Sequence, residues 1–320
     1  MSATRTLRIG TRASALALWQ ARRVSELIGA QAGAPPVELV HIRTEGDLRT
    51  DVPLWAVDGR AFFTKEIDRA LLANEIDVAV HSLKDVSTLM EMGIALVAVL
   101  EREDPRDALV SRNGASLAEL PQGACVGTSS LRRRAFLARA RPDVVQLELR
   151  GNVPTRIEKL EKGEYDAVIL ATAGLKRLGL EKHISSHLPT RDFTSAVSQG
   201  AIGICARSDD AEASRWLGSL DHRATRLATT AERALLRRIE GGCQVPLGAL
   251  ATADANALHL YATVCALDGT KLVSAEARGG ATLGEASALG LKVAEALLAQ
   301  GAGEIIAFQR EGRRPAAEAP

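Results

Sequence analysis

Apolar residues along the chain follow two alternating patterns, short apolar-rich segments and helical spacings of three or four residues. Among the first hundred residues, short apolar-rich segments at residues 7–9, 37–42, 77–81 and 94–100 predict strands, and that at residues 77–81 is expected to be buried. Between them, residues 16–28 and 62–74 place apolar side chains on one face of a helix. Strands that alternate with helices are typical of mainly parallel sheets covered on both faces. The sequence therefore predicts an α/β fold.

The same alternation continues after residue 101. Strands are predicted at residues 108–111, 124–127, 144–149, 167–171 and 201–206, and helices at residues 130–141 and 153–162. Ser130 is the expected N-cap of the first of these helices, and Pro142 ends it. Ligands in such folds bind beyond the carboxyl ends of strands, where helices start. We therefore expect a site at the polar turns of residues 11–14, 82–85, 128–133 and 150–155.

The last third of the chain has a different rhythm. A long helix is predicted at residues 224–239 and ends at Gly241-Gly242. Strands are then predicted at residues 249–252, 258–267 and 271–277. Their short spacing around the turn at Asp268-Gly269 predicts an antiparallel sheet. A last helix at residues 284–300 and a frayed tail from residue 310 complete the expected elements.

Composition and charge narrow the class of protein. The 320 residues suffice for two or three domains, and 46% hydrophobic residues supply their cores. A balance of 40 basic and 39 acidic residues leaves a charge of +1, with no overall attraction to nucleic acid or anionic membranes. Only 3% of the residues are aromatic, so few side chains are available to stack bases. No run approaches the roughly 18 apolar residues of a membrane span.

The cysteines give no sign of a metal site or of disulfides. Cys125, Cys205, Cys243 and Cys265 lie far apart and form no CxxC pair. Residues 1–12 also lack the apolar segment of a secretory signal. We therefore expect a cytoplasmic protein without metal, in which a special cysteine would act as a thiol.

Arginine is concentrated at the predicted strand ends, at Arg12, Arg132, Arg133, Arg150, Arg156 and Arg177. A guanidinium grips a carboxylate through two parallel hydrogen bonds. The helix that begins after Ser130 adds backbone N–H groups and a partial positive charge. As a set, these residues predict a ligand with several carboxylates or phosphates. Any one arginine, taken alone, fits a solvated helix face equally well.

Two further segments carry reactive side chains. The segment His81-Ser82-Leu83-Lys84-Asp85 follows a buried strand, and a carboxylate in a cleft can stabilise a developing cation and move a proton. A structural Lys–Asp turn explains this segment as well, and His81 alone is expected to be a satisfied turn histidine. The second segment is Gly241-Gly242-Cys243-Gln244-Val245-Pro246, a thiol in a glycine-rich loop. Its thiol could be a nucleophile, a covalent anchor or an inert side chain.

These segments occur together in one family. They are Ile9-Gly-Thr-Arg-Ala-Ser-Ala-Leu-Ala-Leu-Trp19, Ala79-Val-His-Ser-Leu-Lys-Asp-Val86, Glu101-Arg-Glu-Asp104, Val126-Gly-Thr-Ser-Ser-Leu-Arg-Arg133, Leu149-Arg-Gly-Asn-Val153, Ala173-Gly-Leu-Lys-Arg-Leu-Gly179, Gln199-Gly-Ala201 and Glu240-Gly-Gly-Cys-Gln-Val-Pro246. In this order, from about residue 7 to the final helix, they resemble porphobilinogen deaminase, also called hydroxymethylbilane synthase.

The resemblance implies a transferase of tetrapyrrole and haem biosynthesis. Members condense four porphobilinogen molecules, with loss of ammonia, into hydroxymethylbilane. They carry one dipyrromethane cofactor per chain, made from their own substrate and bound by a thioether to a loop cysteine, here Cys243. Porphobilinogen is then the small-molecule partner, and we expect a monomer with no nucleic acid, membrane or obligate protein partner.

The resemblance also assigns residues. Asp85 matches the catalytic aspartate of the family and can stabilise the cationic azafulvene left when ammonia departs. Residues expected to bind the cofactor besides Cys243 are Lys84, Thr128, Ser130, Arg132, Arg133 and Arg156. Residues expected to bind substrate are Arg12, Ser14, Arg60, Arg150 and Arg177. Each porphobilinogen brings an acetate and a propionate, which suits a cleft dense in arginine.

Three domains are implied. Two lobes resemble those of periplasmic binding proteins, with mainly parallel sheets; one combines residues 1–101 with residues 200–218, and the other spans residues 102–199. A third small α/β domain with an antiparallel sheet, residues 222–310, bears the cysteine. Residues 311–320 are expected to be a disordered tail.

The chain departs from the family pattern at a few positions. Asp58-Gly59-Arg60-Ala61 stands where the family usually has a Gly-Gly-Lys-Gly-like stretch, and Ala56 replaces a lysine. This segment belongs to a mobile active-site loop in the family, in which Arg60 keeps a positive charge. Elsewhere Ser87 replaces a proline, and Pro154 and Ser198 replace glycines.

Other functions remain open at this point. A two-lobed binding protein without enzymatic activity explains the arginines but gives no role to Cys243 or Asp85. A family member that has lost activity through its altered loop is a variant of this hypothesis. A cysteine hydrolase would need a histidine beside Cys243, and no histidine has a linked signature. An intact mass discriminates, because a covalent dipyrromethane adds two pyrrole units to the polypeptide.

Overall fold

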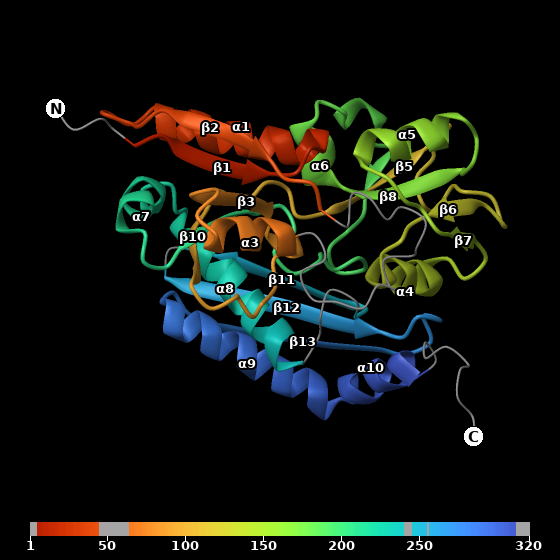
Figure 1. The fold of residues 1–320 in the computed structure, drawn as a ribbon. Coiled ribbons are helices and arrows are strands. Elements are labelled where there is room, and N and C mark those ends of the chain that lie inside the picture. The colour runs from red at the N-terminus through yellow and green to blue at the C-terminus, as the bar shows by residue number, and fades with distance from the viewer. Residues whose placement is uncertain (1–4, 45–63, 240–244, 255, 312–320) are drawn as a thin grey trace, which may run out of the picture.

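Three β-sheets organise the molecule (Figure 1). The structure is a computed structural model that describes residues 5–44, 64–239, 245–254 and 256–311. The first two sheets have five strands each and are mainly parallel, whereas the third has three antiparallel strands. This arrangement confirms the predicted α/β fold class.

The first sheet has the strand order β2-β1-β3-β10-β4. These strands are β1 (Leu7–Thr11), β2 (Val37–His41), β3 (Val78–Ser82), β4 (Ile94–Val99) and β10 (Ile202–Arg207). β10 runs antiparallel between β3 and β4, so a strand from late in the chain completes a sheet begun by the first hundred residues. Cores on both faces are covered by helices, which are α1 (Ala15–Gly29) and α7 (Ala211–Gly218) on one face and α3 (Lys65–Leu72) on the other.

The second sheet repeats this plan with the order β7-β6-β8-β5-β9. Its strands are β5 (Asp107–Ser111), β6 (Cys125–Gly127), β7 (Val145–Leu147), β8 (Ala167–Ala171) and β9 (Ser186–His187). β5 follows the segment that crosses from the first sheet and runs antiparallel to its neighbours. It is the fourth strand of the second sheet, as β10 is the fourth strand of the first. The helices that cover it are α4 (Leu131–Ala140) on one face and α5 (Val153–Glu161) with α6 (Thr172–Arg177) on the other.

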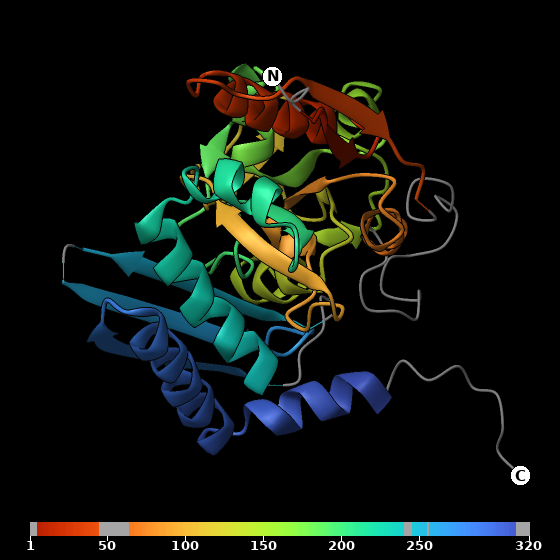
Figure 2. The ribbon, with the colours of Figure 1, turned by 60° about the vertical axis from the view of Figure 1, so that its left-hand side comes forward.

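The third sheet lies below the other two in Figure 1. It consists of β11 (Leu247–Ala253), β12 (Ala257–Cys265) and β13 (Leu272–Gly280), on which α8 (Arg223–Arg238) and α9 (Leu283–Ala299) pack side by side (Figure 2). Cys265, at the end of β12, belongs to the core under α4, so the third sheet is packed against the unit built on the second sheet. Arg226 of α8 donates to the carbonyl groups of Leu96 and Val97, which joins the same unit to β4.

The end of the chain differs from the expectation. A further helix, α10 (Ala302–Glu311), follows α9 where no element was predicted, and its last two residues overlap the frayed tail expected from residue 310. Gly301, with φ 89°, ends α9, and the new helix buries Ile305 and Ile306 in the third core. The short elements α6, α7 and β9 were also not predicted. Of the tail expected at residues 311–320, residues 312–320 lie outside the described residues.

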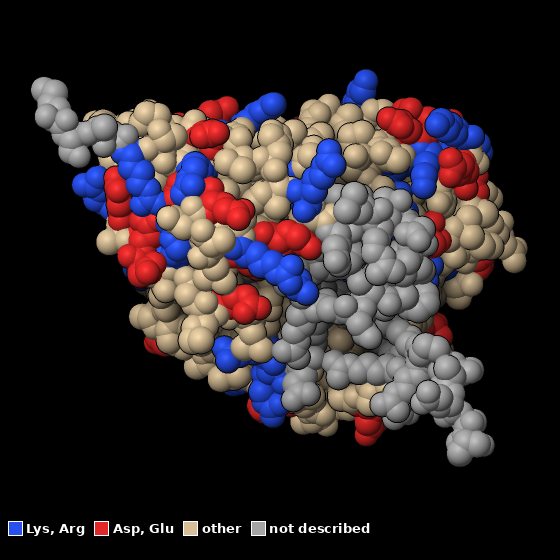
Figure 3. Space-filling view, viewed as in Figure 1, with Lys and Arg blue, Asp and Glu red and all other residues tan. Residues whose placement is uncertain are grey.

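The face of the molecule seen in Figure 3 carries no single dominant charge. Basic and acidic side chains intermingle over the face seen in Figure 3. Among the described helices, none combines the length and apolar character that a membrane crossing requires.

Candidate active site

The turn after β3 holds the residue expected to be catalytic. The strand ends in a single 3₁₀ turn, η2 (Leu83–Asp85), and the N–H of Leu83 donates to the carbonyl of Ala201 at 3.0 Å. Asp85 is partly buried and lines a cavity of about 80 Å³ together with Arg12 and Ser14. Three predicted site residues, from two separate segments of the chain, are therefore brought to one cavity.

The turn between β1 and α1 is held against β3 by local contacts. Ser14 caps α1 by accepting a hydrogen bond from the N–H of Ala17 at 3.3 Å. Gln20 donates from Nε2 to the hydroxyl of Ser82 at 2.8 Å. Because Gln20 and Ser82 both line the cavity, this bond fixes its wall. Sequence reasoning did not single out Gln20.

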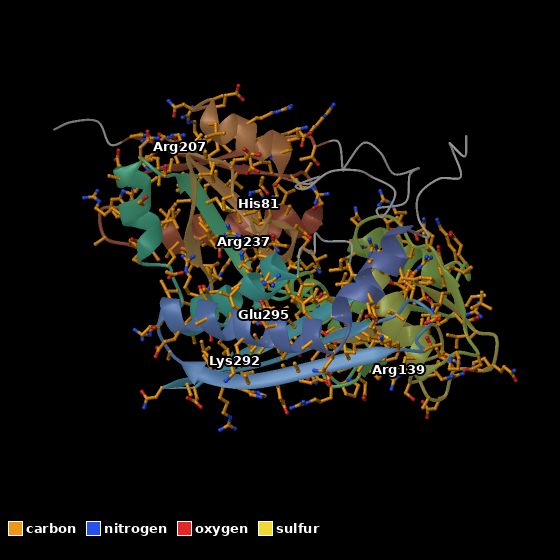
Figure 4. The ribbon with its side chains drawn as sticks, turned by 90° about the horizontal axis from the view of Figure 1, so that it is seen from below. His81, Arg139, Arg207, Arg237, Lys292 and Glu295 are labelled. Carbon is orange, nitrogen blue, oxygen red and sulfur yellow. The ribbon has the colours of Figure 1, made fainter. Side chains whose placement is uncertain are left out.

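His81 differs from the expected satisfied turn histidine. It lies within β3 and lines the cavity, with 6% of its surface exposed (Figure 4). Its Nε2 has no hydrogen-bond partner among the described residues. Burial, reinforced by the charge of Arg12, lowers the pKa of His81 to about 4, so the imidazole is neutral at pH 7. The lining of the cavity therefore includes a neutral imidazole as well as the carboxylate of Asp85.

Lys84 points away from this cavity toward the second sheet. Its Nζ donates to Oε1 of Gln199 at 3.3 Å. Burial lowers the pKa of Lys84 to about 8, while the neighbouring carboxylate of Asp85 acts in the opposite direction. The ammonium group is thus still mostly charged at pH 7.

Arg132 and Arg133, expected to bind cofactor carboxylates, surround a carboxylate of the chain itself. Nη1 of Arg132 lies 2.7 Å from one oxygen of Asp107, and Nη2 of Arg133 lies 2.8 Å from the other. All three side chains are buried. Burial favours the neutral acid, but the two guanidinium charges outweigh it and hold the pKa of Asp107 well below its usual range.

The start of α4 has the predicted form. Ser130 is its N-cap and accepts a hydrogen bond from the N–H of Arg133 at 3.5 Å. The N–H of Ser130 donates to Oγ1 of Thr128 at 3.2 Å, and Thr128 is fully buried. The turn from β6 into α4 is therefore ordered by its own hydroxyl groups.

The remaining described arginines lie in partly buried surroundings. Arg156 donates to the carbonyl of Gly151 at 2.8 Å, and burial together with the charges of Arg133 and Arg150 lowers its pKa to about 10. Arg177 donates to the carbonyl of Gly200 at 2.6 Å and lies 5.7 Å from the ring centroid of Trp19. Burial lowers the pKa of Arg177 to about 10 as well.

Two expected site residues, Cys243 and Arg60, lie outside the described residues. The described thiols bear on the choice of anchor. Cys205 and Cys265 are buried, and burial raises their pKa values to about 12 and about 11. A thiol is nucleophilic as its thiolate, so neither is a good attachment point. Cys125 is partly buried and free.

The charges around Asp107 fit a ligand with several carboxylates. Lys84, Arg132, Arg133 and Arg156 influence one another electrostatically, and Asp107 is the buried carboxylate among them. Desolvated cations such as these are stabilised when an anion enters. A dipyrromethane carries acetate and propionate groups, so the residues present fit this cofactor.

Sequence reasoning missed two members of this cluster. Asp107 is an acidic residue at the start of an otherwise apolar strand, a signal that a buried partner was needed. Gln199 was noted as part of a motif but received no role. Its contacts depend on a tertiary crossing that no local pattern reveals.

Several solved structures that the chain matches at low identity are periplasmic binding proteins. One is a binding protein of Salmonella typhimurium with high arginine specificity, 15% identical, covering 68% of this chain and 91% of that one, with a TM-score of 0.37. Another is the putative periplasmic sulfonate-binding protein of Methylobacillus flagellatus, 14% identical, covering 75% and 69%, with a TM-score of 0.40. A third is a TRAP solute-binding protein of Desulfovibrio salexigens, 12% identical, covering 68% and 73%, with a TM-score of 0.42.

Two family models match the chain. Residues 7–215 match the porphobilinogen deaminase dipyrromethane cofactor binding domain, which spans both five-stranded sheets. Residues 226–299 match the porphobilinogen deaminase C-terminal domain, which contains the third sheet. With the cavity at Asp85 and the buried cations around Asp107, these matches show that the chain belongs to the porphobilinogen deaminase family.

Proposed function

We propose that this protein joins four porphobilinogen molecules head to tail and releases hydroxymethylbilane, thus acting as a hydroxymethylbilane synthase. In each coupling the aminomethyl C–N bond breaks and ammonia leaves. The methylene carbon then bonds to the free α-carbon of the preceding pyrrole, which loses its proton. The observation that carries the proposal is the cavity at Asp85, which Arg12 and Ser14 share.

Asp85 is the proposed catalytic residue. Loss of ammonia leaves a cationic azafulvene, and a carboxylate held beside it stabilises that charge. The same oxygen atoms can accept a hydrogen bond from a pyrrole N–H and take up a proton. The N–H of Leu83 in η2 donates to the carbonyl of Ala201, which immediately precedes β10. This bond helps to keep the carboxylate of Asp85 at the cavity wall.

The carboxylates of the pyrrole rings are the proposed ligands of the cationic residues. Arg12 and Ser14 lie in the cavity of Asp85 and would orient the incoming substrate. Residues proposed for the substrate or the product chain outside this cavity are Arg60, Arg150 and Arg177. Residues proposed to hold the cofactor carboxylates are Lys84, Thr128, Ser130, Arg132, Arg133 and Arg156.

The cofactor would be anchored by a thioether at Cys243. When bound, dipyrromethane supplies the terminal pyrrole α-carbon on which the new chain starts. The proposal for Cys243 is supported by its glycine-rich loop and by the burial of Cys205 and Cys265. Buried thiols with raised pKa values react poorly, which leaves Cys243 and Cys125 as candidates.

The proposal also includes the domain boundaries and the subcellular location. The sheet to which each strand belongs supports one lobe from residues 1–101 with 200–218, a second from residues 102–199, and an anchor domain from residues 222–310. We place the activity in the cytoplasm and assign it porphobilinogen as its small-molecule partner.

Intact mass spectrometry tests the proposal. Wild-type protein should exceed the polypeptide mass by two pyrrole units, and Cys243→Ser should not, whereas the matched variant Cys125→Ser should keep the adduct. Hydroxymethylbilane is measured as uroporphyrin after acid cyclisation and oxidation. An adduct retained on Cys243→Ser contradicts the anchor. A wild-type protein that carries the adduct but forms no product contradicts the catalysis and favours the inactive or purely binding alternatives.

A further inference from the structure

One buried amide connects the two five-stranded sheets at the candidate site. Gln199 has 1% of its surface exposed and lies in the segment that returns from the second sheet to β10. Its Oε1 accepts from Nζ of Lys84 at 3.3 Å. Its Nε2 donates to Oδ1 of Asp107 at 2.9 Å and to the carbonyl of Pro105 at 2.8 Å.

The orientation of this amide follows from the charges on its two sides. A carboxamide is neutral and presents an acceptor at one end and two donors at the other. The acceptor faces the Lys84 ammonium, and the donors face the Asp107 carboxylate and a carbonyl. Hydrogen bonds to charged groups are stronger than those between neutral groups. A flipped amide would lose both charged partners, so a single orientation is strongly favoured.

The backbone around Gln199 is also held on both sides. Its carbonyl accepts from Nε of Arg102 at 2.8 Å. Two residues later, the carbonyl of Ala201 accepts from the N–H of Leu83, the first residue of η2. A displacement of Gln199 would therefore move Lys84 through the side-chain hydrogen bond and move η2 through the backbone.

Asp107 extends the connection into the second sheet. Its carboxylate holds Arg132 and Arg133, which come from the first turn of α4. These contacts form one continuous series, in which no side chain is exposed. The series runs from the cation Lys84 through the amide of Gln199 and the anion Asp107 to the cations Arg132 and Arg133. Its first residue is the immediate neighbour of Asp85.

We propose that Gln199 is a positioning residue that holds Lys84 and Asp107 in register across the two sheets. It thereby sets the distance between the carboxylate-binding cations of the second sheet and the carboxylate of Asp85. The inference rests on the proposed function, because that function assigns these cations to the cofactor. Gln199 would act through its neighbours and need not touch the substrate.

Two substitutions separate positioning from general support of the fold. Gln199→Met keeps the length of the side chain but removes the acceptor for Lys84 and the donors for Asp107. Gln199→Glu places an anion beside Lys84 and also removes the donor. The pKa of Lys84 in the holoenzyme is measured by competitive acetic anhydride labelling at a series of pH values, followed by peptide mass spectrometry. The other charges that act on Lys84 are those of Asp85, Arg133, Asp107 and Arg132.

Opposite shifts are expected in the two variants. Loss of the acceptor disfavours the ammonium, so Gln199→Met should lower the pKa of Lys84. The added anion in Gln199→Glu should raise it. General loosening would admit water and raise the pKa toward its ordinary value in both variants. Shifts in the same direction, or an unchanged pKa in Gln199→Met, would overturn the inference.

Kinetics provide a second readout. The kcat for hydroxymethylbilane formation should fall roughly tenfold in Gln199→Met, as for the loss of a hydrogen bond to a charged group. The KM for porphobilinogen should change little, because Arg12 and Ser14 are untouched. Gln31→Met is the matched control, since the Gln31 amide donates to the carbonyl of Trp216 at 3.0 Å far from the site. An unchanged kcat in Gln199→Met would contradict the positioning role of Gln199. If the wild-type protein itself forms no hydroxymethylbilane, the proposed function is contradicted, and the labelling test of Gln199 still applies.

Discussion

Glu232, in the middle of α8, forms an ion pair with Arg102, whose Nη1 lies 2.5 Å from its Oε1. The carboxylate is fully buried and also accepts from the N–H groups of Ser198 at 2.6 Å and Ala251 at 2.8 Å. Arg102 and Ser198 lie in the two segments that cross between the five-stranded sheets, and Ala251 belongs to β11. One carboxylate thus joins all three parts of the molecule.

Glu232→Gln should destabilise the protein by about 3–5 kcal/mol, because it leaves the buried charge of Arg102 without its partner. Urea unfolding at pH 7 measures the change. The control is Glu295→Gln, which removes an exposed carboxylate 2.7 Å from Arg238 and should cost less than about 1 kcal/mol (Figure 4 labels Glu295). Equal losses in the two variants would show that burial does not distinguish these pairs.

Ser198 has a left-handed backbone, with φ 62°, a conformation that favours glycine. Such a conformation costs a residue with a Cβ about 1–2 kcal/mol, whereas glycine adopts it freely but loses more entropy on folding. Ser198→Gly should therefore raise the free energy of unfolding slightly, by less than about 1 kcal/mol. Ser198→Val should lower it, since a branched side chain tolerates this backbone poorly. Thermal unfolding compares the variants, and a more stable Ser198→Val would contradict the argument.

Asp85→Asn keeps the shape of the side chain but removes its negative charge. Turnover should fall on the order of a hundredfold or more, as when an oriented electrostatic or proton-transfer group is lost. Folding and the covalent adduct should persist, and Asp85→Glu should retain part of the activity. The assay is hydroxymethylbilane formation read as uroporphyrin. Wild-type turnover in Asp85→Asn would make the carboxylate structural.

Asp77 predicts how stability depends on pH. The side chain is buried, and although burial favours the neutral acid, hydrogen bonds from Arg8 and Arg5 hold the pKa of Asp77 well below its usual range. In the unfolded chain it titrates near 4, so the unfolded state binds the proton first as pH falls. The stabilisation is present above about pH 4 and is lost below it, on the order of 2 kcal/mol.

Urea unfolding at pH 7 and pH 3 measures this dependence. Asp77→Asn should be less stable than wild type at pH 7 and should lose less stability on acidification. Arg23 and Glu26 form an exposed pair at 3.5 Å, so Glu26→Gln is a suitable comparison with little expected effect. A wild-type slope in Asp77→Asn would assign the acid sensitivity to other groups, such as Asp107.

Local patterns were sufficient for most of the fold. Short apolar-rich segments and helical spacings located the long helices and most of the strands, because burial imposes these periods directly on the sequence. The N-cap at Ser130 was predicted from its hydroxyl and confirmed. The helix after Gly301 was missed because a positive-φ glycine can end a chain segment or merely reorient it.

The site was harder to predict from sequence than the fold. Strand ends located the turns that hold Arg12, Ser14 and Asp85, because strand ends meet in this architecture, but the roles of Ser14 and Asp85 came from the resemblance to the family. The partners of Arg132 and Arg133 were not found, since a guanidinium serves an internal carboxylate and a ligand equally well. The roles of Gln199 and Glu232 arise where distant segments cross, and no residue spacing along the chain reports such contacts.

The interleaved course of the chain has a consequence for synthesis on the ribosome. β10 lies between β3 and β4, so the first sheet cannot close until residue 207 has emerged, although its other strands are complete by residue 99. The second sheet needs nothing beyond residue 187. The sheet whose strands are translated first is therefore completed after the second sheet. One edge of β3 stays unpaired until β10 has been synthesised. Nascent chains of about 200 residues would consequently expose that edge to chaperones or to one another.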